Sequence, residues 1–180
     1  MAMHTTATNA LIVMGCALLL GGCAGPAGLG GPSVTGYVPA SLMSPNGYSA
    51  TRIDATRYKV GATGTAATPG PRLESIATAR AAEIGVEDKQ RYFKVSGVAH
   101  GVQCTDKQEG YKGPASVATR HPTVTLDIVY SNAATPPDAT YQPSVETFQR
   151  LQAELAAPPA ATVGVADADK DLLARCSGRA

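Results

Sequence analysis

Thr-Val-Thr-Leu-Asp-Ile-Val-Tyr-Ser, residues 123–131, alternates apolar and polar side chains. Val124, Leu126, Ile128 and Tyr130 fall on one side of an extended chain, because successive side chains of a strand point to opposite faces. This period of two predicts a strand with one face on a core. Such a sheet needs other elements to cover its apolar face.

Three further strands are expected around it. Residues 92–98 have an aromatic, β-compatible pattern, whereas residues 48–53 and 57–62 flank Asp54-Ala55-Thr56 in the manner of a hairpin. Residues 106–121 are polar and contain glycine and proline, so we expect a surface loop there.

A first helix is predicted over residues 71–84. Pro71 is tolerated in a first helical turn, and Gly85 suits a left-handed C-terminal cap. At helical spacing, one stripe is formed by Leu73, Ile76, Ala77, Ala81 and Ile84. Arg80 falls inside this stripe, where we expect its stem to cover the sheet margin while its head reaches solvent or a carboxylate. An anion-binding site is the alternative.

A second helix is predicted over residues 144–157, with Ser144 as N-cap. Its apolar face is expected to carry Val145, Phe148, Leu151, Gln152 and Leu155. A short third helix is expected over residues 167–176. The order β-β-α-β-β-α predicts an α+β domain, with a small antiparallel sheet of about four strands and helices packed on one face.

The composition excludes a dominant electrostatic partner. The chain has 180 residues and a formal net charge of +1. Nucleic acid is therefore not expected as a partner, because its recognition rests on clustered positive charge.

The N-terminus has the features of an export signal. Residues 10–20 are apolar but too few to cross a bilayer as a helix, so they fit the hydrophobic region of a signal peptide. This run ends in Leu20-Gly21-Gly22-Cys23, which resembles the lipobox of bacterial lipoproteins. The resemblance implies a signal peptide over residues 1–22 and lipid attachment at Cys23.

In lipoproteins, the cysteine thiol forms a thioether with a lipid, and several acyl chains together anchor stably. The absence of aspartate at Ala24 implies the outer membrane, facing the periplasm, in a Gram-negative host. Residues 1–9 contain no lysine or arginine, unlike typical signals. An unlipidated signal peptide, an uncleaved anchor and a weaker lipobox at Cys16 are the alternatives.

Three regions follow from this interpretation. Residues 1–22 are the signal peptide, residues 23–47 are the lipidated N-terminus with a flexible tether, and residues 48–180 are a single α+β domain. The tether is expected because glycine and proline recur through it without an apolar period. A glycine-rich binding loop is the alternative.

Several short motifs resemble those of small proteobacterial envelope lipoproteins of unknown function. These motifs are Gly47-Tyr48-Ser49, Arg52-Ile53-Asp54, Arg57-Tyr58-Lys59-Val60, Arg80-Ala81-Ala82-Glu83 and Tyr92-Phe93-Lys94-Val95. The similarity covers residues 20–105, where a lipobox, a Gly/Pro tether, a hairpin, a helix and an aromatic-led strand follow one another. The resemblance implies a location in the cell envelope, and it supplies no catalytic residues.

Cys104 and Cys176 are the cysteines of the expected domain. In an exported protein, such a pair most simply forms a disulfide, here closing a long loop. The alternative combines Cys104 with His100, His121 and Asp127 in a metal site or a thiol–histidine pair. The spacing of these residues on a strand or loop does not direct them to one point.

No catalytic residues, metal or cofactor are expected, because the chain lacks the phosphate-binding, serine-elbow and zinc-helix motifs. The expectation is a non-enzymatic envelope accessory or structural protein, held by membrane lipid at Cys23 and partnered with an envelope protein or the cell wall. A small-ligand-binding module at the membrane is the alternative, and an enzyme is a further one.

Overall fold

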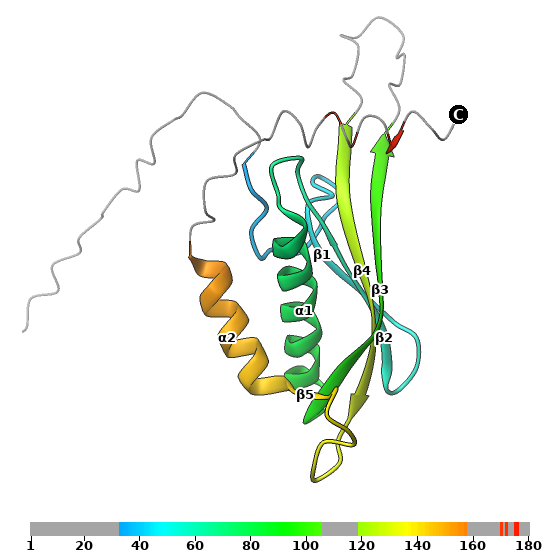
Figure 1. The fold of residues 1–180 in the computed structure, drawn as a ribbon, viewed down its shortest axis with the longest axis vertical. Helices are drawn as coiled ribbons and strands as arrows, with labels where there is room; N and C mark the ends of the chain where they lie inside the picture. The colour runs from blue at the N-terminus through cyan, green and yellow to red at the C-terminus, as the bar shows by residue number, and fades with distance from the viewer. Residues whose placement is uncertain (1–32, 106–118, 158–169, 171, 173–174, 177–180) are drawn as a thin grey trace, which may run out of the picture. The chain divides into compact units, whose positions relative to one another are not determined.

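The computed structural model describes residues 33–105, 119–157, 170, 172, 175 and 176. In these residues, five antiparallel strands form one sheet in the order β1-β2-β4-β3-β5, with two helices packed against it (Figure 1). The predicted α+β class is thus confirmed. The additional strand, β5, has only two residues, Gln142–Pro143.

Strand β4 (Thr119–Ser131) lies at the centre of the sheet. It pairs with β2 (Arg57–Thr63) on one side and with β3 (Tyr92–Thr105) on the other. β1 (Gly47–Arg52) extends the sheet beyond β2, which confirms the expected hairpin. The alternation predicted for β4 is also confirmed: its four inward side chains are buried, and they are Val124, Leu126, Ile128 and Tyr130.

β3 and β4 are longer than expected. Their pairing continues to Thr105 and Thr119, so His121 lies in β4 opposite Gln103. The prediction that His121 ends a loop is therefore wrong, since strand pairing overrides the weak local pattern there. Residues 106–118 of the predicted loop lie outside the described residues.

A bulge interrupts β3 between Val95 and Gly97. The residue at this irregularity, Ser96, donates a hydrogen bond from its Oγ to the backbone oxygen of Asp127 at 3.0 Å. A bulge bends a strand and redirects its side chains. The two parts of β3 therefore keep their apolar residues on the helix side despite the additional residue.

Helix α1 (Gly70–Glu87) contains the predicted stripe but ends later than expected. Gly85 is a buried residue inside this helix, whereas the cap residue is Asp88 and the left-handed residue is Lys89, with φ 56°. The prediction of Gly85 as a cap is wrong. The absence of a side chain there instead permits close packing, because a Cβ atom would lie 2.8 Å from the Cβ of Ser144.

Helix α2 (Ser144–Ala156) packs on α1 and corrects two predictions. Pro143 is the N-cap, and Ser144 is a buried first residue whose Oγ has no hydrogen-bond partner among the described residues. Val145 and Gln152, both expected on the apolar face, are exposed, and Thr147 is buried instead. The face is rotated toward Ser144 because that small residue meets Gly85.

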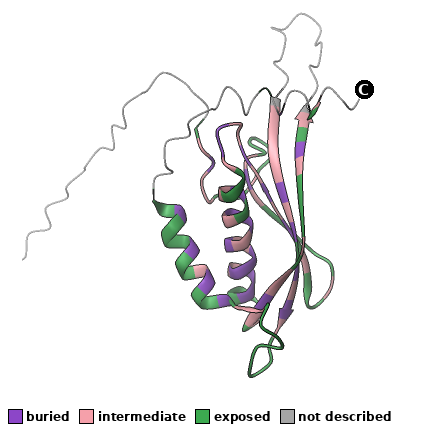
Figure 2. Cartoon of the chain, in the orientation of Figure 1, coloured by how far each residue is buried: buried purple, intermediate pink, exposed green. Residues whose placement is uncertain are grey.

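The core lies between the sheet and α1 (Figure 2). α1 contacts β4, β2, β1 and β3, while α2 contacts α1 and the short β5. The chain is thus layered as sheet, α1 and α2. The fully buried side chains at the centre include Val60, Leu73, Ile76, Phe93 and Leu126.

The segment before β1 is more ordered than the sequence predicts. From Ser33 onward the chain follows the domain: Thr35 is buried between Thr65 and Thr68, and its Oγ1 accepts a 3.0 Å hydrogen bond from Thr68 Oγ1. Pro39 forms a parallel bridge to Tyr48 at the start of β1. The expected flexible tether to residue 47 is therefore wrong for residues 33–47, because hydroxyl and aromatic side chains fix this part to the domain.

Candidate functional site

Cys23 and the signal segment 1–22 lie outside the described residues, as does the rest of the tether up to residue 32. The described chain begins beside the connection between β2 and α1, where the backbone oxygen of Ser33 accepts a 2.8 Å hydrogen bond from Thr65 Oγ1. The tether therefore joins the domain at the end that carries the connection between β2 and α1. No helix in the described ranges is long and apolar enough to cross a bilayer.

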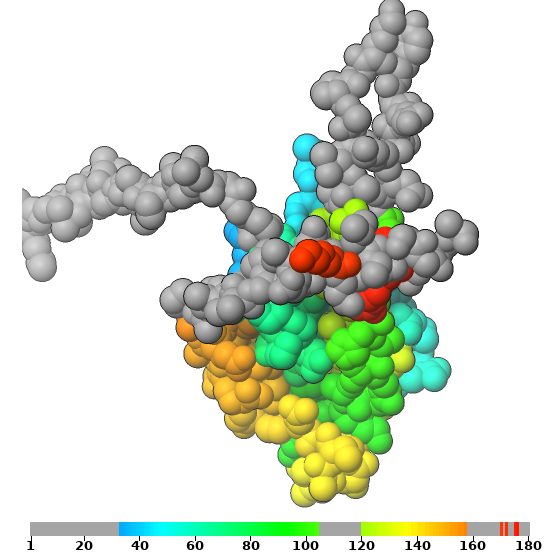
Figure 3. Space-filling model, turned by 45° about the horizontal axis from the view of Figure 1, so that its top comes forward, coloured from blue at the N-terminus to red at the C-terminus, as the bar shows by residue number. Residues whose placement is uncertain are grey.

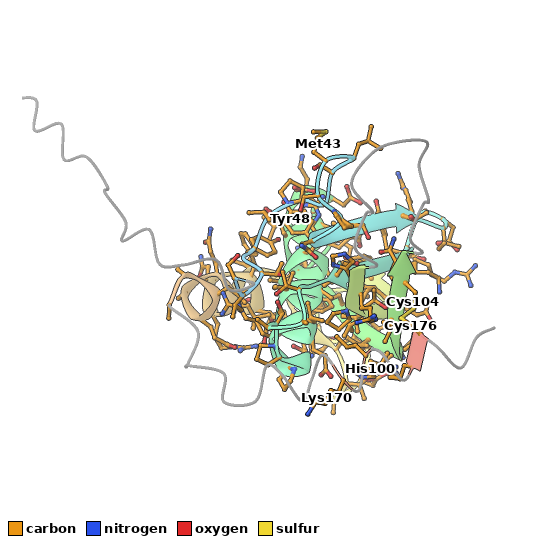
Figure 4. All side chains as sticks on the ribbon, turned by 90° about the horizontal axis from the view of Figure 1, so that it is seen from above. Met43, Tyr48, His100, Cys104, Lys170 and Cys176 are labelled. Carbon is orange, nitrogen blue, oxygen red and sulfur yellow. A yellow bond between two sulfur atoms is a disulfide. The ribbon has the colours of Figure 1, made fainter. Side chains whose placement is uncertain are left out.

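The two domain cysteines meet at the end of β3. Cys104 Sγ and Cys176 Sγ are 1.99 Å apart, with the Cα atoms separated by 5.9 Å (Figure 4). This separation is within the range that a disulfide requires. The structure thus places the predicted pair together, while most of the third helix expected over residues 167–176 lies outside the described residues.

The alternative metal or thiol site is not assembled. Nε2 of His100 lies 3.4 Å from Glu74 Oε1 on α1, whereas His121 Nδ1 lies 2.8 Å from Asn46 Oδ1. The Sγ atom of Cys104 is bonded to Sγ of Cys176, so it is not available as a metal ligand or a nucleophile. Among the residues that the structure describes, no three histidine, cysteine or acidic side chains gather as ligands.

Asp127, the fourth residue of that alternative, lies on the sheet face away from the helices. Its Oδ1 is 2.7 Å from Lys59 Nζ. Lys59 and Asp127 line a shallow recess of about 380 Å³ that also includes Ile53, Tyr58 and Ser96. The recess contains two cations, Lys59 and Arg57, and one anion, Asp127. Lys59 and Asp127 neutralise each other and are half exposed to water, while Arg57 pairs with Asp54.

A cluster of interacting polar groups connects α1 with β1 and with the segment before β1. Arg80 Nη1 lies 2.6 Å from Glu83 Oε2 and 3.0 Å from Glu87 Oε1, and its guanidinium covers the ring of Tyr48 at 5.4 Å. Tyr37 donates a 2.6 Å hydrogen bond to Glu83. We call these five residues the tyrosine clasp.

The electrostatics of the tyrosine clasp favour a structural role. Burial raises the pKa of Tyr37, and its hydrogen bond to Glu83 raises it further. Partial burial lowers the pKa of Arg80, but the hydrogen bonds to Glu87 and Glu83 outweigh it, so the net shift is upward. Both groups therefore keep their protons at neutral pH. The predicted contact of the Arg80 head with a carboxylate is confirmed, and its charge is already matched by two carboxylates.

Tyr37 was missed in the sequence because it lies among glycines and prolines that predict a tether. Its ring is 4.7 Å from that of Tyr48 and 6.5 Å from that of Phe148, measured between centroids. An isolated tyrosine in such a segment could have indicated that the segment packs on the domain, because burying an aromatic side chain removes a large area from water.

Comparison of the chain with protein-family models, with curated proteins and with solved structures finds no match. The resemblance to envelope lipoproteins therefore stays a prediction, and no site residue is transferred from a relative.

Proposed function

We propose that this protein is a lipoprotein of the bacterial envelope, lipidated at Cys23 and held at the outer membrane facing the periplasm. The observation that carries the proposal is Leu20-Gly21-Gly22-Cys23 at the end of an apolar run. The juxtaposition of Cys104 and Cys176 supports it, because disulfides persist in oxidising compartments outside the cytoplasm.

Mass spectrometry of the membrane fraction tests whether the protein is lipidated at Cys23. We expect the mature N-terminal peptide to begin at Cys23 and to carry acyl mass, and we expect Cys23→Ala to abolish it. Cys16→Ala is the matched control, because it removes the other cysteine of the signal region and leaves the lipobox intact. A wild-type peptide without acyl mass would refute lipidation.

The proposed role is that of a non-enzymatic accessory protein that binds an envelope protein. The observation that supports this role is the pairing of the polar groups in the tyrosine clasp and of Lys59 with Asp127. Catalytic acids, bases and nucleophiles instead need shifted, available groups in a cleft. Cross-linking in intact cells, followed by identification of adducts, tests the role. Adducts to one envelope protein support it, and adducts to the cell wall alone would contradict it.

A ligand-binding module is the second candidate, because the recess beside Lys59 and Asp127 is the feature of the open sheet face that suits a small molecule. Native mass spectrometry of protein purified from the membrane distinguishes the two roles. Additional mass on the wild type that is lost in Lys59→Ala would favour the ligand-binding module. Lys94→Ala is the control, because Lys94 pairs with Asp138 and does not line the recess.

A further inference from the structure

A tight turn before β1 presents two large apolar side chains to solvent. Ser41 and Ser44 close it through reciprocal backbone hydrogen bonds of 2.8 and 3.2 Å, and Ser41 Oγ accepts a further 3.1 Å bond from the Ser44 backbone N–H. Between them, Leu42 has a relative exposure of 106% and Met43 of 95%. We call residues 41–46 the Leu-Met turn.

Its tip points away from the domain. Figure 4 shows the side chain of Met43 directed outward, and Figure 3 shows the cyan part of the chain projecting from the body of the domain. Two adjacent, fully exposed apolar side chains on a hydrogen-bonded turn differ from the scattered exposed residues common on protein surfaces. The turn presents them as a convex tip.

The stretch of sequence that contains the tip has no acidic or basic side chains of the lysine, arginine, aspartate or glutamate type. From residue 5 to residue 51 the chain contains no lysine, arginine, aspartate or glutamate. Desolvating an ionised group at an apolar boundary costs far more than desolvating a hydroxyl or an amide. The chain on both sides of the tip therefore approaches an apolar boundary without burying a charge.

The Leu-Met turn lies at the end of the domain that the tether reaches. Ser33, the first described residue, is hydrogen-bonded to Thr65, and Asn46, the last residue of the turn, contacts His121, which also lies 3.3 Å from the oxygen of Gly64. Gly64 and Thr65 are consecutive. The beginning of the described chain and the turn also lie at the same end in Figure 1.

The length of the tether limits how far this end can lie from the lipid. Residues 24–32 separate Cys23 from Ser33, and a fully extended chain of about ten residues spans at most about 35 Å. The end of the domain that carries the Leu-Met turn is thus held within that distance of the acylated cysteine, at a high local concentration relative to the bilayer.

We propose that Leu42 and Met43 insert into the headgroup–acyl boundary of the membrane that holds Cys23, as a second contact that orients the domain. This inference rests on the proposed lipid anchor. A bilayer is the occupant that fits, because it accepts a small convex apolar tip without a complementary pocket. A stable protein interface needs a buried area of about 800 Å² on each partner, far more than two side chains supply.

The test uses the absence of tryptophan from the chain. Full-length lipoprotein carrying Leu42→Trp is reconstituted into phosphatidylethanolamine–phosphatidylglycerol vesicles, with or without acyl chains brominated near the headgroup. Val145→Trp is the matched control, because Val145 is 49% exposed at the start of α2, and α2 begins at the opposite end of the domain (Figure 1). Each variant must melt at the wild-type temperature.

We expect the Leu42→Trp emission to shift to shorter wavelength on reconstitution and to lose intensity on brominated lipid, and we expect Val145→Trp to do neither. Equal emission and quenching for the two variants in protein that floats with the vesicles would overturn the inference and leave the anchor intact. Protein that does not float with the vesicles would overturn the lipid anchor itself, and the inference with it.

Discussion

Gly85→Ala should destabilise the domain through the contact between α1 and α2. The new Cβ atom would lie 2.8 Å from Ser144 Cβ and 3.2 Å from Tyr130 Cε1, and still closer to Ser144 Oγ. Real Cβ atoms essentially never lie within 3.0 Å of another atom, so Ser144 must move, and the 3.2 Å contact with Tyr130 is tighter than most. Because Tyr130 and Ser144 are both buried, neither has free space to move into.

The expected magnitude follows from two opposing effects. Overpacking a buried contact costs about 1–3 kcal/mol, whereas replacing glycine by alanine inside a helix stabilises it by about 1 kcal/mol. We therefore expect Gly85→Ala to lower the free energy of unfolding by up to about 2 kcal/mol. This loss corresponds to a fall of the melting temperature by about 2–4 °C per kcal/mol for a chain of this size.

A double-mutant cycle with Ser144→Gly identifies the cause. That change removes the Cβ and Oγ atoms nearest to the new methyl group, together with a buried hydroxyl that has no partner among the described residues. Urea unfolding of the four proteins measures the coupling free energy, which we expect to favour the double variant by about 1–3 kcal/mol. An identical loss from Gly85→Ala in both backgrounds would refute the proposed contact.

Three further changes have defined outcomes. Tyr37→Phe, which removes the 2.6 Å hydrogen bond to Glu83, should cost about 1 kcal/mol and speed amide hydrogen exchange in residues 34–40. Cys176→Ser should lower the stability of the non-reduced protein by up to about 4 kcal/mol, and dithiothreitol should have the same effect on the wild type. The backbone N–H of Thr56 and a neighbouring arginine lower the pKa of Asp54 from 3.8 to about 2. Its contribution is therefore complete above about pH 4 and is lost as the pH falls toward 2, so the melting temperatures of wild type and Asp54→Asn should converge over that range.

Each of these predictions has a contradicting result. Unchanged exchange in Tyr37→Phe would mean that ring packing alone holds the segment. A wild type whose unfolding curve is insensitive to dithiothreitol would show that no disulfide forms at Cys176. A constant difference between wild type and Asp54→Asn from pH 6 to pH 2 would contradict the lowered pKa.

The elements were predictable where side-chain periodicity is strong. The alternation in residues 123–131 gave the central strand and its buried face, and the alanine-rich stripe gave α1. The ends of these elements were less accessible to sequence reasoning, because pairing with distant residues decides them. His121 is in a strand since β3 extends to meet it, and Gly85 is inside a helix since Ser144 approaches it.

The candidate site was predictable only in part. Cysteine usage alone led to the pairing of Cys104 with Cys176. The position of Arg80 in an apolar stripe predicted that its head reaches solvent or a carboxylate, but not that Glu83 and Glu87 are the partners. Tyr37 and the Leu-Met turn were hidden because glycine and proline surround them, which is a composition typical of tethers. The contacts that order this segment come from Thr65, Thr68 and Glu83, which lie far along the chain.

The central position of β4 has a consequence for how the protein is made. The hairpin of β1 and β2 is complete by Thr63, but its partner strand begins only at Thr119. During synthesis from the N-terminus, the edge of β2 that pairs with β4 therefore stays unpaired until β4 has been made. Pairing between segments that lie far apart in the sequence is also slow. Unpaired edges are where nascent chains associate wrongly. We therefore expect the β1–β2 hairpin to be the part of the nascent chain that most needs a chaperone.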